Sequence, residues 1–452
     1  MDYAIEHFSA RRAEHGLCTR EIQATIDAAG RTGGVVRIPS GTWRSGTLRL
    51  RSHVRLDLAP GAVLLGSEDP DDYPQSFPGD VTSMRPFDRR LVLAEHCEDV
   101  AVTGMGVIDG AGGCYGKIEG GNEKRPTNLQ FIACRGVVVR DVTLRRSGSW
   151  MQQYLQCDDV HLHNLRVFNH GNKTNDGLDI DACHDVRISD CNIDSHDDAL
   201  VFKSTGPRRC RDIVVSNCRL SSHCHGIKFG TESLGGFERI SIANCIVSPS
   251  TVPAKHPQFP EGLPVITGMA LECTDGGTMR DISISNLIID TAFAPIFVKL
   301  GNRHRKLGPD DAEPGPGLIE DIRISNITAR NSGPFGGSIT GYPGQFVRRV
   351  RLSNIDIEHR GGAAPESIMA SVPENSDHYP EIKMFGNAIA GPHLPAYGLY
   401  LRHVRDISLR DCRFRTRQAD ARRAVVADDV EGLELRDVVD HLGRRDQACL
   451  ER

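Results

Sequence analysis

The sequence of 452 residues lacks the features that mark several common functional classes. Its net charge of -5 is modest, and it shows no basic face of the kind that binds nucleic acid or an anionic membrane. No apolar run approaches the roughly 18 residues that a membrane-spanning helix needs. The N-terminus, MDYAIEHFSARRAEHG, has no apolar stretch or cleavage site of a secretory signal. We therefore expect no nucleic-acid or membrane partner and a cytoplasmic location, unless a leader has been removed from a secreted protein.

The sequence also lacks a CxxC pair, which argues against a zinc ribbon although there are 14 cysteines. Cys191, Cys218 and Cys245 recur at intervals of 27 residues, and Cys412 takes the same place in a later phrase. Because these cysteines take the same position in successive repeats, we expect them to form one stacked row of small apolar side chains in a core. We expect these cysteines to be reduced and structural, with no metal bound.

The N-terminal part predicts a helix followed by strands. Residues Thr19 to Gly30 place Ile22, Ile26 and Ala29 on one stripe, with Thr19 as the expected N-cap. Alternating apolar and polar residues between Gly-rich turns then predict strands up to about residue 66. A helix before a run of strands is suited to cover the open end of a repeat array.

From residue 100 onward one phrase, D-V/I-x-I/V-S-x-C, recurs with a period of about 23 to 28 residues and with longer intervals at insertions. The period is too short for a propeller blade, and no helical pattern separates the phrases. A recurring Asn (217, 244, 286, 326 and 354) suits a turn row that hydrogen-bonds along the array. The first aliphatic residues of the phrases are Val100, Val137, Val160, Val186, Ile213, Ile240, Ile282, Ile322, Val350, Ile407 and Leu433.

These features predict an all-β fold, a single-stranded right-handed parallel β-helix with an N-terminal capping helix. We expect one domain over residues 1–452, with the cap and first strands in about 1–66 and the repeating coils in about 91–440. Long loop insertions are expected near 249–268, 302–318 and 361–400. Nothing in the sequence fixes the oligomeric state.

Alternation along one series of strands predicts which side chains leave the core. Asp179 and Asp181 point outward in DGLDIDA, because Leu178 and Ile180 point inward. Only nine residues are lysines, yet three of them face outward from this series, which indicates a charged groove. The outward residues of the later strands are Lys203, Lys228, Ala270, Glu272 and Lys299.

Three aspartates stand at the entrances of successive strands in this series: Asp176 and the adjacent pair Asp197 and Asp198. Each by itself is typical of a turn. Together they suit hydrolysis of a glycosidic bond, which needs one protonated carboxyl to donate to the leaving oxygen and one carboxylate to activate water. Mutual repulsion of neighbouring carboxylates raises one pKa and so supplies the acid.

The order NDG, DDA and HG on such a repeat resembles glycoside hydrolase family 28, the polygalacturonases and rhamnogalacturonan hydrolases, whose motifs run N-T-D, D-D, G-H-G and R-I-K. The resemblance implies that Asp197 is the general acid, that Asp176 and Asp198 activate water, and that His225 tunes the acid and contacts substrate. It also implies inversion at the anomeric carbon and no cofactor. His223 is the alternative to His225, and Asn175 of the first motif is a further substrate-binding candidate.

The chain departs from the family where the R-I-K motif is expected, because the aligned strand reads Ala270-Leu271-Glu272. Arg and Lys there hold a uronate carboxylate, which Glu272 would repel. Either the sugar is neutral, or nearby cations compensate. The cations and polar residues suited to compensate are Lys203, Lys228, Lys299, Asn302, Arg303 and Arg305.

The insertion at 361–401 carries Tyr379, Tyr397 and Tyr400, which either stack on a sugar or pack against the solenoid. Long loops at the ends of a groove favour exo action. We therefore expect an exo-acting hydrolase of galacturonate-containing oligosaccharides or polysaccharides. The alternatives are a hydrolase of neutral or rhamnose-containing glycosides, a polysaccharide lyase that uses Lys203 or Lys228 and a calcium ion, and a β-helix that binds sugar without catalysis.

Overall fold

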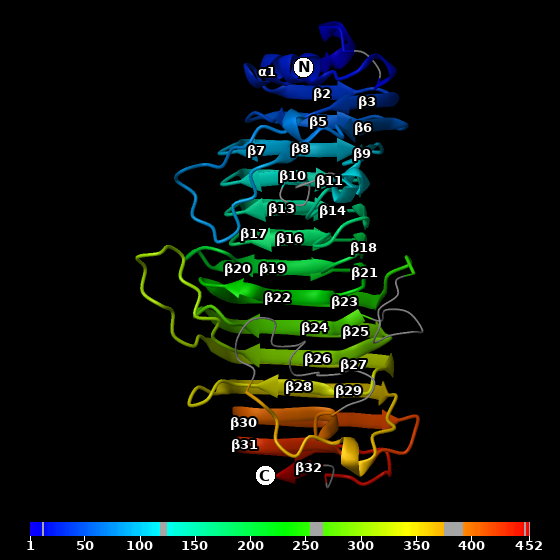
Figure 1. Cartoon of the computed structure of the whole chain (residues 1–452), viewed down its shortest axis with the longest axis vertical. Coiled ribbons are helices and arrows are strands. Elements are labelled where there is room, and N and C mark those ends of the chain that lie inside the picture. The colour runs from blue at the N-terminus through cyan, green and yellow to red at the C-terminus, as the bar shows by residue number, and fades with distance from the viewer. Residues whose placement is uncertain (11–12, 118–123, 254–264, 375–391, 447–448, 452) are drawn as a thin grey trace. The chain divides into compact units, whose positions relative to one another are not determined.

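The computed structural model describes the chain except residues 11–12, 118–123, 254–264, 375–391, 447–448 and 452. Its contacts divide the chain into two compact units. Unit 1 contains Met1–Val201 with Cys210–Cys218, and unit 2 contains Phe202–Arg209 with Arg219–Arg452. In each unit, parallel strands lie one above another as successive coils (Figure 1). The fold is the predicted right-handed parallel β-helix.

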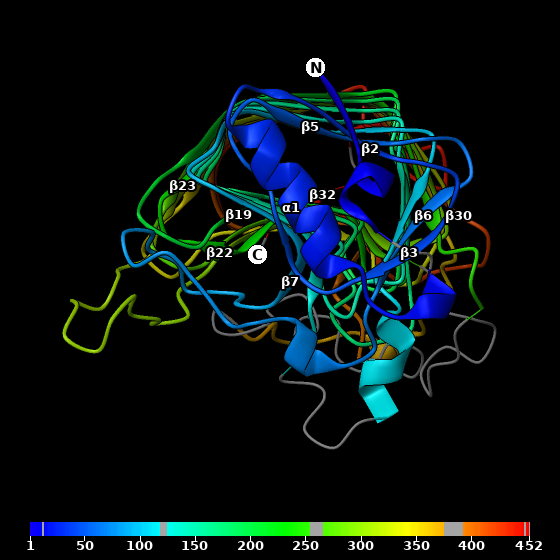
Figure 2. The same cartoon turned by 90° about the horizontal axis from the view of Figure 1, so that it is seen from above.

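Unit 1 begins with the predicted helix, α1 (Thr19–Gly30). Its buried face contains the predicted stripe of Ile22, Ile26 and Ala29. The helix packs against β2 (Gly34–Ile38) and β5 (Val54–Leu58), and Figure 2 shows it lying across these first strands. The N-cap prediction was wrong by one residue. Cys18 occupies that position, and the hydroxyl of Thr19 instead accepts a hydrogen bond from the Gly46 amide at 2.9 Å.

The predicted phase of the repeat is confirmed by the strand register in unit 1. In β8 (Glu98–Gly104), β11 (Arg135–Arg140), β14 (Asp158–His163), β17 (His184–Ser189) and β20 (Cys210–Ser216), the first aliphatic residues pair across parallel strands. Because side chains alternate along a strand, this register directs each of them into the core. The paired residues are Val100, Val137, Val160, Val186 and Ile213.

The same phase holds in unit 2. There the strands that carry the phrase are β23 (Gly236–Pro249), β25 (Thr278–Asp290), β27 (Leu318–Ser332), β29 (Val347–His359), β30 (Ala396–Thr416) and β31 (Arg423–Arg436). The residues in register are Ile240, Ile282, Ile322, Val350, Ile407 and Leu433.

A second series of strands in unit 2 carries three of the predicted substrate-binding residues, Lys228, Glu272 and Lys299. It consists of β22 (His225–Ser233), β24 (Val265–Cys273), β26 (Ala292–Leu300) and β28 (Gly337–Thr340). Among the described residues, no helix has the length and apolar character needed to cross a membrane.

Rows of identical side chains tie the coils together. In unit 2 the amides of Asn244, Asn286, Asn326 and Asn354 form a chain of hydrogen bonds of 2.9 to 3.0 Å, as the turn row predicted. Each of these residues has φ between 53° and 57°, a left-handed conformation that Asn tolerates better than most residues. Asn217, in unit 1, instead reaches Asp190 at 3.5 Å.

The cysteines are thiols at all thirteen positions where the structure describes their side chains, and eleven of them are buried. Cys191 and Cys218 in unit 1, and Cys245 and Cys412 in unit 2, are buried as predicted. The sequence analysis missed a second cysteine row in unit 1, in which a thiol reaches a backbone carbonyl of the preceding coil, such as Cys183 Sγ to Tyr154 O at 3.1 Å. The thiols that make this contact are Cys97, Cys157, Cys183 and Cys210. Cys134 belongs to the same row, and its Sγ accepts a hydrogen bond from the Cys97 amide at 3.4 Å.

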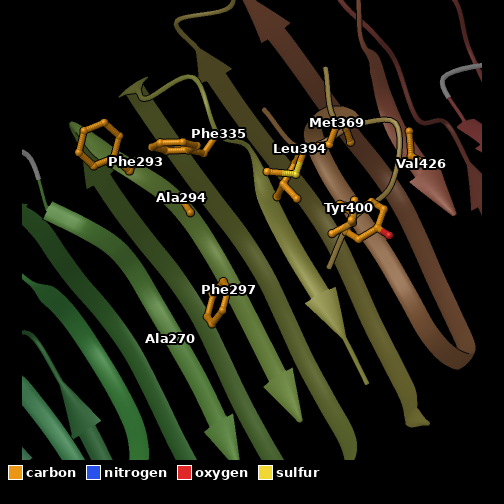
Figure 3. Close-up of a cluster of buried hydrophobic side chains, with 11 residues drawn as sticks. Ala270, Phe293, Ala294, Phe297, Phe335, Met369, Leu394, Tyr400 and Val426 are labelled. Carbon is orange, nitrogen blue, oxygen red and sulfur yellow. The ribbon is translucent and has the colours of Figure 1, made fainter. Parts of the chain in front are cut away.

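Apolar side chains also cover part of the outer face of the strands in unit 2. Phe297 and Tyr400 belong to a buried cluster with Met369, Val372 and Leu394 from the segments that precede β30 (Figure 3). These side chains therefore cover the outer face of unit 2 at β26 and β30. The remaining members of the cluster are Ala270, Phe293, Ala294, Phe335, Ala396 and Val426.

Candidate active site

The three predicted aspartates lie on two neighbouring turns of unit 1. Asp176 precedes β16 (Leu178–Asp181), and Asp197 and Asp198 follow β18 (Asn192–Ser195). Two backbone hydrogen bonds join the turns on either side of Asp176. The Asp197 amide donates to Asn175 O at 3.3 Å, and the Gly177 amide donates to Asp198 O at 2.8 Å. The coil repeat thus brings together residues that are about twenty positions apart in sequence.

The three aspartates differ in exposure. Asp176 and Asp198 are 3% and 4% exposed, whereas Asp197 is half-buried. Asp197 Oδ1 accepts a hydrogen bond from the Asp198 amide at 3.1 Å, and its carbonyl accepts one from Ser195 Oγ at 2.8 Å. These bonds fix the turn, and they leave Asp197 as the most accessible of the three.

Asn175 holds the turn of Asp176 in place. Its amide nitrogen donates to Ser147 O at 3.1 Å and Ser149 O at 2.7 Å, and its Oδ1 accepts from the Asn172 amide at 2.7 Å. The side chain is fully buried. The sequence analysis placed Asn175 among the substrate-binding residues, but the structure gives its side chain backbone partners within unit 1.

Asn169 completes this arrangement, and the sequence analysis missed it. Its Oδ1 accepts from Asn175 Nδ2 at 3.2 Å and from the Ser147 amide at 3.0 Å. Its Nδ2 donates to Asp176 O at 2.8 Å. The position of Asp176 is therefore set by two buried amides rather than by the aspartate turn alone.

A pair of histidines beside the aspartates was also missed. His170 Nε2 lies 3.0 Å from Asp194 Oδ1, and its ring lies 4.7 Å from the half-exposed ring of Phe168. His196 lies next to Asp197, and burial lowers its pKa although Asp197 acts in the opposite direction. Both histidines directly follow strands and are 26 residues apart, one repeat, which is the signal that could have identified them.

The outer face of unit 1 next to Asp176 is polar. In register, Gln153 lies opposite Asp179 and Gln130 lies opposite Gln153, so the predicted outward direction of Asp179 and Asp181 is confirmed. Gln130 Nε2 donates to Gln153 Oε1 at 2.6 Å, and Gln153 Nε2 donates to Asp181 Oδ2 at 3.0 Å. Gln130, Gln153, Asp179 and Asp181 are all fully buried, so these hydrogen bonds join side chains of successive coils.

In unit 2 the register confirms the predicted outward row. Lys228 pairs with Ala270, and Glu272 pairs with Lys299. Lys203 Nζ lies 3.5 Å from Glu232, and all these side chains are buried although they leave the core. Burial lowers the pKa of Lys299 to about 8, and its amine donates to Glu374 O at 2.9 Å.

The two candidate histidines have different partners. His225 begins β22, and its Nδ1 lies 2.7 Å from Thr267 Oγ1. His223 precedes this strand, and its Nε2 donates to Val252 O at 2.7 Å. Both rings are buried.

The polar residues after β26 contact other parts of unit 2. Asn302 Oδ1 accepts from the His304 amide at 2.9 Å, and Arg303 forms a two-pronged pair with the buried Asp275. Burial alone would lower the pKa of Arg303, but Asp275, with Glu232 and Glu272, raises it. Arg303 is thus held as a cation by the carboxylates around it.

The tyrosines of the long insertion do not form an exposed stacking face where the structure describes them. Tyr397 is fully buried, with its ring 5.2 Å from that of His441 and its hydroxyl donating to Phe414 O at 3.2 Å. The substrate-binding assignment of Tyr397 is corrected accordingly, because its ring packs inside unit 2. Tyr400 is buried in the outer apolar cluster, and Tyr379 lies outside the described residues.

Two proteins with polygalacturonase-type names are similar to this chain in sequence. Over 189 residues the chain is 30% identical to a probable polygalacturonase of Vitis vinifera, an alignment that covers 38% of this chain and 37% of the relative. Over 116 residues it is 33% identical to an exo-poly-alpha-D-galacturonosidase of Dickeya chrysanthemi, covering 24% of this chain and 19% of the relative. The alignments thus span well under two thirds of either relative.

The family 28 exopolygalacturonase of Yersinia enterocolitica has a similar structure, with a TM-score of 0.71 and 17% identity over 97% of this chain and 78% of that one. The model of glycosyl hydrolases family 28 matches residues 77–376, which include all three aspartates and both candidate histidines. The chain belongs to glycosyl hydrolases family 28.

Proposed function

We propose that this protein hydrolyses α-glycosidic bonds of galacturonate-containing oligosaccharides with inversion of configuration. The observation that carries the proposal is the placement of three aspartates on two hydrogen-bonded turns of a family 28 chain. The names of the Vitis and Dickeya relatives support a galacturonate substrate.

In the proposed reaction Asp197, the most accessible of the three, donates a proton to the glycosidic oxygen as the bond breaks. Asp176 and Asp198 act as the base that removes a proton from the water that attacks the anomeric carbon on the opposite face. This order requires about 6.5 to 9.5 Å between the acid and base carboxyls, which leaves room for the water. Water is the nucleophile, so the reaction needs no cofactor. We assign His225 to contact with the sugar.

We further propose exo action. The Dickeya relative is named as an exo-acting enzyme, and this supports the proposal. The apolar cluster over Ala270, Phe297 and Tyr400 adds a physical reason, because a buried face cannot accept further sugar units (Figure 3). A sugar chain that lies on the outer strands of unit 2 would have to end before this cover. In viscometry of polygalacturonate, reducing ends should appear well before viscosity falls, and early loss of viscosity would contradict exo action.

The reaction itself is tested by incubating the protein with oligogalacturonides, rhamnogalacturonan fragments and neutral α-glycosides and recording the first product anomer by NMR. We expect the β-anomer from oligogalacturonides. Asp197→Asn should lower kcat by about 10²- to 10⁴-fold, the usual contribution of a general acid. Asp185→Asn, at an exposed aspartate of β17 in unit 1, is the matched control and should leave kcat unchanged.

Each competing function gives a different result in the same assay. Retention of the α-anomer would contradict inversion. An unsaturated uronate product that disappears with chelator would identify a lyase. Cleavage of neutral glycosides alone would identify a hydrolase of neutral sugars, as expected if Glu272 repels the carboxylate of a uronate. A protein that binds these sugars but cleaves none of them, with or without Asp197, would be a sugar-binding β-helix.

A further inference from the structure

Arg125 is a partly buried residue of unit 1 that the sequence analysis did not single out. It lies just before β10 (Thr127–Ile132), which pairs in parallel with β13 (Gln152–Leu155), and β13 pairs with β16. These strands belong to successive coils of unit 1, so the turns that precede them follow one another along one edge of the strand series. Asp176 is in the third of these turns.

The guanidinium group of Arg125 donates to the turns of the two following coils. Its Nη1 donates to Gly148 O at 3.2 Å, in the turn before β13, and to Lys173 O, in the turn before β16. Its Nη2 donates to Thr174 Oγ1 at 3.0 Å. One side chain can join these successive turns because a guanidinium group is planar and presents five N–H donors in a fixed fork.

The backbone beside Arg125 packs closely against the second of these turns. A Cβ atom built on Gly148 would lie 2.9 Å from both Cδ and O of Pro126, so a side chain at this glycine would push the two segments apart. Ser147 Oγ also donates to Pro126 O at 3.3 Å. The backbone of Arg125 is therefore held at the second turn, and its side chain reaches the third.

The third turn is held from two sides. Buried hydrogen bonds of Asn175 and Asn169 hold it from inside unit 1. On the exposed side, Thr174 has a φ of 54°, a left-handed conformation that a β-branched residue keeps only where its surroundings restrain it. Arg125 provides such a restraint, because it binds the Thr174 hydroxyl and the carbonyl of the preceding residue.

We propose that Arg125 is a positioning residue of the active site, which fixes the turn of Asp176 from the exposed side. The proposal rests on the proposed function, in which Asp176 takes part in activating water. Arg125 need not contact the reacting atoms in this role. An inverting reaction requires the acid and base carboxyls to leave room for one water, so a loosened turn slows the attack of water more than it weakens the binding of sugar.

The first test is the kinetics of Arg125 variants with an oligogalacturonide. Arg125→Ala should lower kcat about tenfold and change KM by less than about twofold, since small misplacements of reacting groups have effects of this size. Arg125→Lys should recover only part of the loss, because an amine restores the charge but not the fork that reaches both turns. Millimolar guanidinium chloride should partly restore the kcat of Arg125→Ala and should not stimulate the wild-type protein.

A double-mutant cycle tests whether Arg125 acts through Asp176. Asp176→Asn removes the carboxylate and should by itself lower kcat by about 10²- to 10⁴-fold. If Arg125 affects turnover by positioning that carboxylate, Arg125→Ala should lower kcat by less than about twofold in the Asp176→Asn background. A general loss of stability would not produce this dependence on Asp176.

Arg89→Ala is the matched control. The side chain of Arg89 is also partly buried in unit 1, and it also donates to two backbone carbonyls, those of Pro70 and Tyr73, both at 2.7 Å. Its removal should leave kcat unchanged and insensitive to guanidinium. Thermal unfolding verifies that each variant is folded at the assay temperature, and the cycle is run with Arg125→Lys if Arg125→Ala does not fold.

The outcomes separate this proposal from the proposed function. A folded Arg125→Ala variant with wild-type kcat overturns the positioning role and leaves the proposed function intact. An equal loss of kcat in the presence and absence of the Asp176 carboxylate does the same. A raised KM with unchanged kcat also overturns the positioning role, because it identifies a substrate contact. Full activity of Asp176→Asn, or a wild-type protein that cleaves no oligogalacturonide, refutes both.

Discussion

Replacing Asn175 by Ala should separate a structural role of this residue from a substrate-binding one. The Asn175 side chain is fully buried and makes contacts with Ser147 O, Ser149 O, the Asn172 amide and Asn169 Oδ1. Without it, Ser149 O and Asn169 Oδ1 keep other hydrogen bonds, from Asn169 Nδ2 at 3.0 Å and the Ser147 amide at 3.0 Å. Ser147 O and the Asn172 amide lose the bonds described for them.

Two polar groups that lose their partners cost about 1 to 3 kcal/mol each when they are buried. The Asn172 turn is only partly buried, so the expected loss in the free energy of unfolding is about 2 to 4 kcal/mol. The turn of Asp176 loses one of its two buried amides, and kcat should fall by about 10- to 100-fold, since small misplacements of reacting groups have effects of this size. KM should change little.

Urea unfolding monitored by circular dichroism gives the stability, and steady-state kinetics with an oligogalacturonide give kcat and KM. Asn192→Ala in the same unit is the matched control, because that side chain is exposed, and it should cost less than about 0.5 kcal/mol. A variant with wild-type stability and kcat but a raised KM would refute the reasoning and return Asn175 to the substrate-binding residues.

Three further predictions concern side chains that are packed inside unit 1 or inside unit 2. Phe335→Ala removes a ring that lies 5.2 Å from the ring of Phe293 in the apolar cluster of unit 2. The free energy of unfolding, measured with urea, should fall by about 3 to 5 kcal/mol. A loss under about 1 kcal/mol would show that this cluster is not tightly packed. The pKa of His359 lies at about 3 because burial, with Arg422, disfavours the charged ring. An unfolded His titrates near 6.5, so between about pH 3 and 6.5 the unfolded state binds more protons at this position than the folded state does. His359 therefore makes stability fall as pH drops, by at most about 1.4 kcal/mol per pH unit, and His359→Leu should reduce the measured slope by up to this amount. An unchanged slope would contradict the contribution of His359. Among the thirteen cysteines described, only the partly buried Cys114 and Cys224 should react rapidly with a thiol reagent in the native protein, as mass mapping would reveal. Rapid labelling within the row from Cys97 to Cys210 would contradict the stacked core.

The sequence by itself determined the coil repeat and the faces of its strands. Side chains alternate along each strand, and the coils are about 23 to 28 residues long, so one parallel register places the first aliphatic residues in one row. Val137, Val160 and Val186 were therefore placed correctly in the core without coordinates. The same alternation correctly directed Asp179, Lys228 and Lys299 away from the core. These features are local and repeat in every coil, which is why the sequence carries them.

Tertiary structure alone decided what lies over the outward residues. Outward direction predicted exposure, but Lys299 and Glu272 are buried because other segments of unit 2 cover the strands. The ring of Tyr397 is buried inside unit 2. The sequence shows that this tyrosine lies near a loop, but it does not show on which side of the strand the ring packs. The partners of Asn175 come from turns about 26 residues away, and no local pattern specifies a hydrogen bond to a backbone carbonyl. The sequence could place the aspartates near each other, whereas only the folded chain could reveal the buried amides and the arginine that hold the turn of Asp176.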